Sequence, residues 1–357
     1  MNMIKDSFIY LRGLRHVDFT VFCVSDGQKN YFDPQFNRSV PYSSGQQVKR
    51  SIMDAFLSLI HAEPSPTTFY FDVDRKGALK EGEVMSLCNP MYADQLIGGW
   101  MKSGKGGTEK TLKRRSPLSI SAMTPLHPLL ASLPKENISF DRSDRPNVHK
   151  VIVRDPDGNQ LDDEQISKLL NGQDRSLLRK WIPENSRATG LFVYDVAVDL
   201  RRLFSVSENQ IEPEVSQETL EDLKKSGWVL GKSVFGNVLT MPKGQRKKLM
   251  PAIADALIEW QITSNQARTY SPMETLAIAI SDNANAIAAA IRAKLIDDAD
   301  DKPKAKPIID KNAGADLFIT LPCAGYVVTE DEQSDALEKA KQELVDKMMA
   351  FDYENQL

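Results

Sequence analysis

The chain has 357 residues, of which 41% are hydrophobic and 26% charged, a composition typical of a soluble globular protein with one or two domains. Its formal net charge of −4 excludes binding of nucleic acid through bulk charge, so any such site must be a local basic surface. The three cysteines, Cys23, Cys88 and Cys323, lie far apart and predict reduced core thiols rather than a disulfide framework or a zinc site. Without a signal peptide or an apolar run of the ~18 residues that a membrane span needs, we expect a cytoplasmic protein.

Residues 7–73 predict a strand, a helix and a second strand. The first strand, 7–24, alternates apolar and polar residues and contains Gly13, which is typical of a bend, a bulge or a close backbone approach. The helix spans 44–60, where apolar residues recur at helical spacing and Pro64 ends the segment. The run 67–73 is rich in aromatic and β-favouring residues and predicts the second strand.

The helix start at 44–50 is the most informative stretch. Ser44 and Gln47 have the spacing of a capping box. Lys49 and Arg50 oppose the helix dipole in the first turns, and free amides with two nearby cations favour a phosphate site. The alternative interpretation is an ordinary solvated face, as for most cations on helices.

A second basic segment lies in the long irregular region 74–187. Between Lys102 and Arg115 there are six cations and one anion, Glu109, among several glycines. This pattern favours a loop that attracts phosphate, although it lacks the spacing of a P-loop and a solvated charge run is the alternative. Residues 162–181 predict a surface helix.

The rest of the chain predicts further elements of one sheet. The clearest strand is 190–200, followed by a hairpin or projection at 228–239, a helix at 249–263, a strand at 275–281 and a final helix at 330–349. Stripped of insertions, the order is βαββαβ, an α+β fold with a ferredoxin-like, RNA-recognition-motif-like palm. The predicted divisions are 1–61 and 188–204 (palm), 62–187 (fingers insertion), 205–245 (thumb-like projection) and 246–357 (palm and C-terminal helix).

Catalytic signals are weak and binding signals are stronger. The four histidines have no triad-like or metal-like context, Asp72 and Asp74 lack a third ligand, and we expect no cofactor and no metal. Asp26 and Asp33 precede the central helix in turn dipeptides. Candidates for stacking or wedging against bases are Trp100, Met101, Trp228 and Phe235, whereas Trp181 and Trp260 are expected in the core.

Five short motifs in order carry a resemblance to a known family. They are Gly13-Leu14-Arg15, Pro41 to Arg50, Asp94 to Trp100 with its Gly98-Gly99 pair, Lys113 to Ser121, and Gly190 to Val196. Together they resemble the CRISPR-associated backbone subunit of type I surveillance (Cascade) complexes, the seventh Cas family of the RAMP superfamily. The match covers most of residues 7–280, and none of the motifs is catalytic.

The resemblance implies a hand-shaped subunit that polymerises along guide RNA (crRNA), with each thumb reaching its neighbour. Its partners would be guide RNA, the target DNA strand through that guide, copies of itself and other effector subunits, with no membrane. The implied RNA-binding residues are Ser44, Gln46, Gln47, Lys49, Arg50, Arg12, Arg15, His16, Lys102, Lys105, Lys113, Arg114, Arg115, Lys232 and Arg268. The region from about 295 onward has no match.

Two alternatives stay open at this point. One is an RNA-cleaving backbone subunit of a type III-like complex, a metal-dependent endoribonuclease with Asp26 or Asp33 as catalytic residue. The other is a protein-only scaffold whose basic clusters contact acidic surfaces such as the 330–349 helix of a neighbour.

Overall fold

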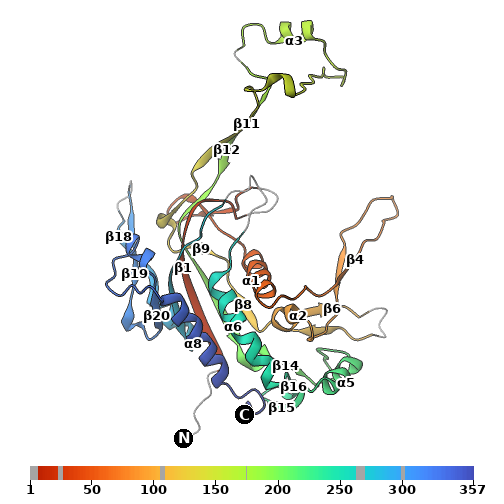
Figure 1. The fold of residues 1–357 in the computed structure, drawn as a ribbon, viewed down its shortest axis with the longest axis vertical. Helices are drawn as coiled ribbons and strands as arrows, with labels where there is room; N and C mark the ends of the chain where they lie inside the picture. The colour runs from red at the N-terminus through yellow and green to blue at the C-terminus, as the bar shows by residue number, and fades with distance from the viewer. Residues whose placement is uncertain (1–6, 23–26, 105–108, 174, 263–269, 299–301) are drawn as a thin grey trace.

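A computed structural model describes residues 7–22, 27–104, 109–173, 175–262, 270–298 and 302–357. The fold mixes helices with one central antiparallel sheet and several two- and three-stranded sheets, which confirms the α+β class (Figure 1). The central sheet has the strand order β10 (Ala131–Ser132), β13 (Ala188–Asp199), β1 (Phe8–Thr20), β17 (Thr275–Ser281) and β20 (Asp316–Ile319). Two further short strands, β8 (Leu118–Ile120) and β9 (Thr124–Pro125), also pair with β13. No helix in the described ranges has the length and apolar character of a membrane span.

The long strands β1 and β13 fix the register of the sheet. Gly13 lies opposite Tyr194, and a Cβ atom at Gly13 would sit 2.2 Å from the Tyr194 ring. Only glycine leaves room for this ring, whose hydroxyl donates to the Leu257 carbonyl at 2.8 Å. The predicted close backbone approach at Gly13 is therefore confirmed.

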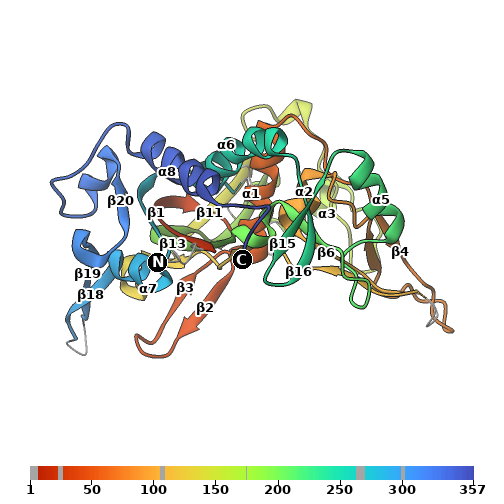
Figure 2. The same cartoon turned by 90° about the horizontal axis from the view of Figure 1, so that it is seen from below.

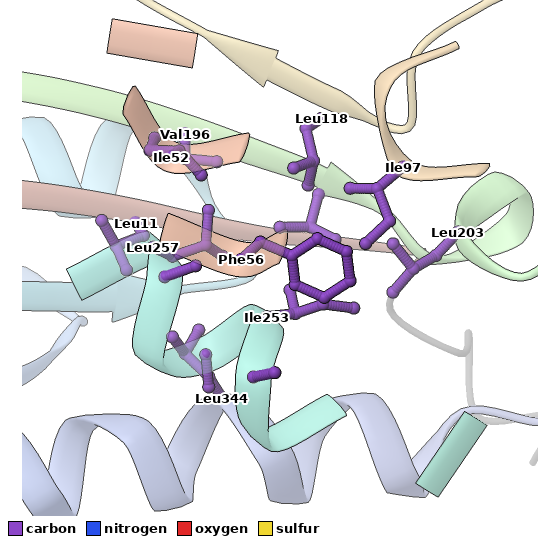
Figure 3. Packing of buried hydrophobic residues seen from close by; sticks show 14 of the residues in the cluster. Leu11, Ile52, Phe56, Ile97, Leu118, Val196, Leu203, Ile253, Leu257 and Leu344 are labelled. Carbon is purple, nitrogen blue, oxygen red and sulfur yellow. The ribbon is translucent and has the colours of Figure 1, made fainter. Parts of the chain in front are cut away.

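Helices cover one face of the sheet and form the main core (Figure 2). They are α1 (Gly45–Leu59), α6 (Lys243–Glu259) and α8 (Ala336–Ala350). In Figure 3, Phe56 of α1 lies beside Ile253 of α6, Leu257 of α6 lies beside Leu11 of β1, and Leu344 packs from α8. The opposite face carries a smaller cluster around Leu14, covered by α7 (Ala284–Ala290) and the hairpin of β18 (Ile291–Asp297) and β19 (Lys304–Ile309).

The predicted second strand at 67–73 does not join the central sheet. Its residues 67–70 form β4 (Thr67–Tyr70), which pairs only with β5 (Glu83–Ser86) in a projecting hairpin. All four β4 residues are exposed, so this strand has no buried face that could pack on a core. The sheet position beside β13 is filled instead by the short pieces within 118–132.

Residues 135–186 form an arm that extends from the body (Figure 1). Its stem is a two-stranded ribbon of β11 (Lys135–Asp141) and β12 (Arg179–Ser186). The predicted helix at 162–181 is wrong in length, because α3 (Asp163–Leu169) ends early and residues 179–186 pair as a strand. We call these residues together with Arg187 (135–187) the arm, and β11 with β12 the ribbon.

The predicted projection at 205–245 is a small sheet packed on the body. It has the order β14 (Ser205–Ser207), β16 (Gly236–Thr240) and β15 (Val229–Ser233), so the expected hairpin at 228–239 is confirmed. The chain end holds β15 in place, since the Lys232 amide donates to the Glu354 carbonyl and the Gln356 amide to the Lys232 carbonyl, both at 2.9 Å. The remaining elements are α2 (Ala93–Gly98), α4 (Leu200–Leu203), α5 (Gln217–Lys225), β2 (Asn30–Asp33), β3 (Arg38–Pro41), β6 (Trp100–Lys102), β7 (Leu112–Arg114) and short 3-10 turns at 128–130, 146–148, 311–313 and 321–325.

Candidate nucleic-acid interface

Ser44 caps the start of α1 as predicted, but the second half of the predicted capping box does not form. The Ser44 hydroxyl accepts the Gln47 amide at 3.4 Å, and the Gln47 side chain accepts the hydroxyl of Ser43 at 3.0 Å rather than reaching back to the N-cap amide. A Cβ atom at Gly45 would lie 3.0 Å from the Ile120 carbonyl oxygen, so the first turn sits close against segment 120–123. Gln46 is the exposed residue of this turn.

The two cations of α1 have different surroundings. The Lys49 ammonium group donates to the Gly98 carbonyl and to the Ser116 hydroxyl, both at 2.9 Å, and burial lowers its pKa. Arg50 is three-quarters exposed and pairs with Asp54 one turn on. Arg50 therefore faces solvent, whereas Lys49 joins α1 to the segments on either side of the 99–115 region.

Replacing Lys49 by methionine is expected to lower the free energy of unfolding by about 1–3 kcal/mol, because two half-buried acceptors lose a charged donor. Arg50→Ala should change it by less than about 0.5 kcal/mol, as is usual for an exposed i,i+4 pair. Urea unfolding of both variants measures the difference, and equal stabilities would contradict a structural role for Lys49.

The predicted RNA-binding residues Arg12 and Arg15 of β1 make contacts within the protein. Arg15 is 1% exposed, and its guanidinium donates to the carbonyls of Ile258 and Trp260 at 2.6 Å each while lying 4.2 Å over the Trp260 ring. Arg12 forms a bidentate ion pair with Asp195, with nitrogen–oxygen distances of 2.7 and 2.9 Å. Arg15 is thereby removed from the surface candidates.

The remaining predicted RNA-binding residues differ in their surroundings. The His16 ring stacks 4.1 Å from that of Tyr326, with Nδ1 3.5 Å from Glu274. Lys102 is half-buried, and the Lys232 side chain is exposed on the strand held by the chain end. Lys105, Arg268 and Asp26 lie outside the described residues.

Alternation along β7 separates its cations into two classes. Arg114 is 2% exposed, whereas Lys113 and Arg115 on either side of it are exposed. The Arg114 guanidinium donates to the carbonyls of Leu96, Arg202 and Ser205, and burial lowers its pKa to about 10, opposed by the charge of Glu214. Arg114 therefore remains charged at neutral pH but is not available to a ligand.

A cavity of about 600 Å³ opens between residues 110–115 and 202–214. We call it the basic pocket; its charged lining is Lys110, Lys113, Arg115, Arg202, Glu212 and Glu214, with Phe235 at one side. Arg202 pairs with the buried Glu214 at 3.0 Å and lies 4.2 Å over the Phe235 ring, which is 44% exposed. Four cations beside an exposed aromatic ring can hold phosphates and stack a base.

The pocket unites predicted residues with one that the sequence reasoning missed. Lys113, Arg115 and Phe235 were predicted, but Arg202 follows the strongest strand in the chain and that position gave no signal of a site. The other stacking candidates divide: Met101 is 61% exposed, but Trp100 and Trp228 are 7% and 4% exposed and belong to the core. The Trp100 indole donates to the Glu214 carbonyl at 2.6 Å.

The expected core positions of two tryptophans are half right. Trp260 is fully buried, as predicted. Trp181 is 55% exposed on β12, so its predicted core position is wrong.

The carboxylates considered for catalysis or metal binding, Asp33 and Asp74, accept backbone hydrogen bonds in turns. Asp33 accepts the Phe36 amide at 2.9 Å in the turn between β2 and β3, and Asp74 accepts the amides of Lys76 and Ala78 in the β4–β5 hairpin. Within the described ranges, no group of three or more His, Cys, Asp or Glu side chains is placed to hold a metal ion.

Comparison with known proteins gives likenesses to solved structures alone. No family model and no curated protein matches the chain. A chain of a CRISPR RNA-guided surveillance complex aligns with the present chain. The alignment covers 94% of the present chain and 80% of the matched chain, with a TM-score of 0.38 and 11% sequence identity. A chain of a CRISPR RNA-guided surveillance complex described as pre-nicking also aligns. The alignment covers 96% of the present chain and 88% of the matched chain, with a TM-score of 0.42 and 8% sequence identity.

Proposed function

We propose that the chain is a non-catalytic backbone subunit of a CRISPR effector complex in the cytoplasm. It polymerises along guide RNA, binds the RNA backbone without reading its sequence, and presents it for pairing with target DNA in antiviral defence. The observation that carries the proposal is the basic pocket, where Lys113, Arg115 and Arg202 surround an exposed Phe235. Sequence-independent binding of single strands needs this combination of cations and a stacking surface.

We interpret the central sheet as a modified RNA-recognition-motif palm. The antiparallel order 118–132, β13, β1, β17, with α1 and α6 on one face, is that of a βαββαβ unit in which 118–132 supplies the second strand. The basic pocket then lies where the insertion after α1 meets the small sheet after β13.

The non-catalytic form is favoured by the role of Asp33, whose carboxylate holds a turn through the Phe36 amide. Loss of target-RNA cleavage in Asp33→Ala, with assembly intact, would instead support an endoribonuclease.

Purification of the chain alone through washes of stated salt concentration tests the proposal. We expect a large RNase-sensitive species with a high 260/280 nm absorbance ratio, which weakens steeply as salt rises because phosphate contacts release counterions. A monomer free of nucleic acid at low salt, with no shift on adding single-stranded RNA, would refute RNA binding.

We also propose that the β4–β5 hairpin, rather than the packed sheet at 205–240, contacts the next copy along the RNA. Phe69 and Val84 are directly paired across the hairpin and each is 59% exposed, so they form an apolar surface on one face.

Phe69→Ser with Val84→Ser is expected to reduce the RNA-bound species from several copies to one or two, while binding of a short oligonucleotide is retained. Light scattering after size exclusion measures the copy number. Leu169→Ser, which removes an exposed apolar side chain from α3, is the control. An unchanged copy number in the double variant would exclude the hairpin as the contact.

A further inference from the structure

The arm separates its charges into two regions. Its flanks, 135–154 and 175–187, contain nine Lys or Arg and four Asp or Glu, whereas the tip, 155–174, contains one Lys and six Asp or Glu. The flanks include the ribbon, which extends away from the central sheet in Figure 1. The ribbon itself contains three Lys or Arg and three Asp or Glu, so the excess of cations lies mainly in the segments that continue it, 142–154 and 175–178, and the acidic region is 155–174.

The ribbon exposes an aromatic ring on each of its two faces. In the antiparallel register, Phe140 lies opposite Lys180, and the adjacent Ser139 lies opposite Trp181. Directly paired residues share a face and neighbours alternate, so Phe140 and Trp181 point to opposite faces. The two rings are 54% and 55% exposed. A hairpin that packed on its own body would place its aromatics on one face only.

Cations accompany each ring. Exposed Lys180 shares the face of Phe140, and Arg179 shares the face of Trp181, where it pairs with Asp141 at 2.8 Å. Just beyond β11, exposed Arg142, Arg145 and Lys150 continue the basic surface, with Arg145 3.9 Å from Asp144. Aromatic rings with cations beside them, together with the positive charge just beyond β11, are suited to a polyanion that has an aromatic base in each unit.

We propose that the ribbon is a second binding surface for a single-stranded polynucleotide, separate from the basic pocket. Bases stack on Trp181 and Phe140, and the cations beside them contact the phosphates. Stacking on an aromatic side chain does not depend on base identity, so we expect the surface to bind without sequence preference. The acidic tip repels the strand and confines it to the ribbon and the basic segments that continue it.

Trp181 is a built-in reporter, because the other three tryptophans of the chain are at most 7% exposed. Titration of the full chain with twelve-residue oligo(U) or oligo(dT) is expected to quench tryptophan emission, with the effect lost at high salt. The variant Lys113→Ala, Arg115→Ala, Phe235→Ala removes the pocket and should retain this quenching, so the arm is tested even if the pocket binds nothing. A preference for one of the two oligomers identifies RNA or DNA as the strand.

Phe140→Ser and Trp181→Ser together should weaken binding of a fluorescein-labelled oligomer to the pocket variant by at least about tenfold, given the contribution of each stacked base. Lys168→Ala in the acidic tip should leave binding unchanged. Unaltered tryptophan emission on saturation, or equal affinity with and without the two rings, would overturn the proposal and leave the ribbon as a surface for a protein.

Discussion

Replacing Lys113, Arg115 and Phe235 by alanine is expected to weaken binding of single-stranded RNA by about a hundredfold or more at low salt. The ring accounts for about 1–3 kcal/mol through stacking, and each lost phosphate contact lowers the slope of log affinity against log salt by about 0.7. We therefore expect the salt slope to fall by about 1.4. All three side chains are exposed, so the fold should be retained.

Fluorescence anisotropy with labelled oligo(U) at several salt concentrations measures both quantities. A matched control, Lys168→Ala with Lys225→Ala, removes two exposed cations from helix ion pairs elsewhere and produces the same change in net charge. Phe235→Tyr keeps the ring and should bind nearly as well as the unmodified chain. If the triple variant and the charge control behave alike, the pocket is not the RNA site.

Local patterns predicted the longest elements, which are β1, α1, β13, α6 and α8, but few of the short ones. The helix expected at 44–60 is α1, 45–59, because cap and apolar spacing are both written in adjacent residues. The strand beside β13 could not be predicted, since 118–132 pairs with it only in pieces of two or three residues, which leaves no periodic pattern. Residues 67–70 had the stronger strand propensity, but propensity does not say which sheet a strand joins.

The candidate site shows the same limit for side chains. The sequence does not distinguish Lys113, Arg114 and Arg115. Only the side-chain directions along β7 and at the residue after it separate the buried Arg114 from the two exposed cations. Arg202 joins them from almost ninety residues away, through contacts that arise only when the chain folds. Composition located the basic segment, and tertiary structure decided which of its members face a ligand.

Arg15 is another buried cation, and we expect its replacement to have the largest effect on stability. The α6 helix ends at Glu259, and the two carbonyls that Arg15 binds, those of Ile258 and Trp260, lie at its last turn. Helix carbonyls there have no partner within the helix, and the negative end of the dipole favours a cation. Arg15 thus ties the first strand to the end of a helix that is more than two hundred residues away in the sequence.

Arg15→Met is expected to lower the free energy of unfolding by about 3–5 kcal/mol, because two buried carbonyls lose charge-assisted bonds and the Trp260 ring loses its cation. Arg15→Lys should cost less, since an ammonium group restores the charge but cannot span both carbonyls in the plane of a guanidinium. Urea unfolding followed by tryptophan fluorescence measures both, with Arg50→Ala as a neutral reference. If Arg15→Met were as stable as the unmodified chain but lost RNA, Arg15 would be a ligand of RNA and its burial would have to be reversed on binding.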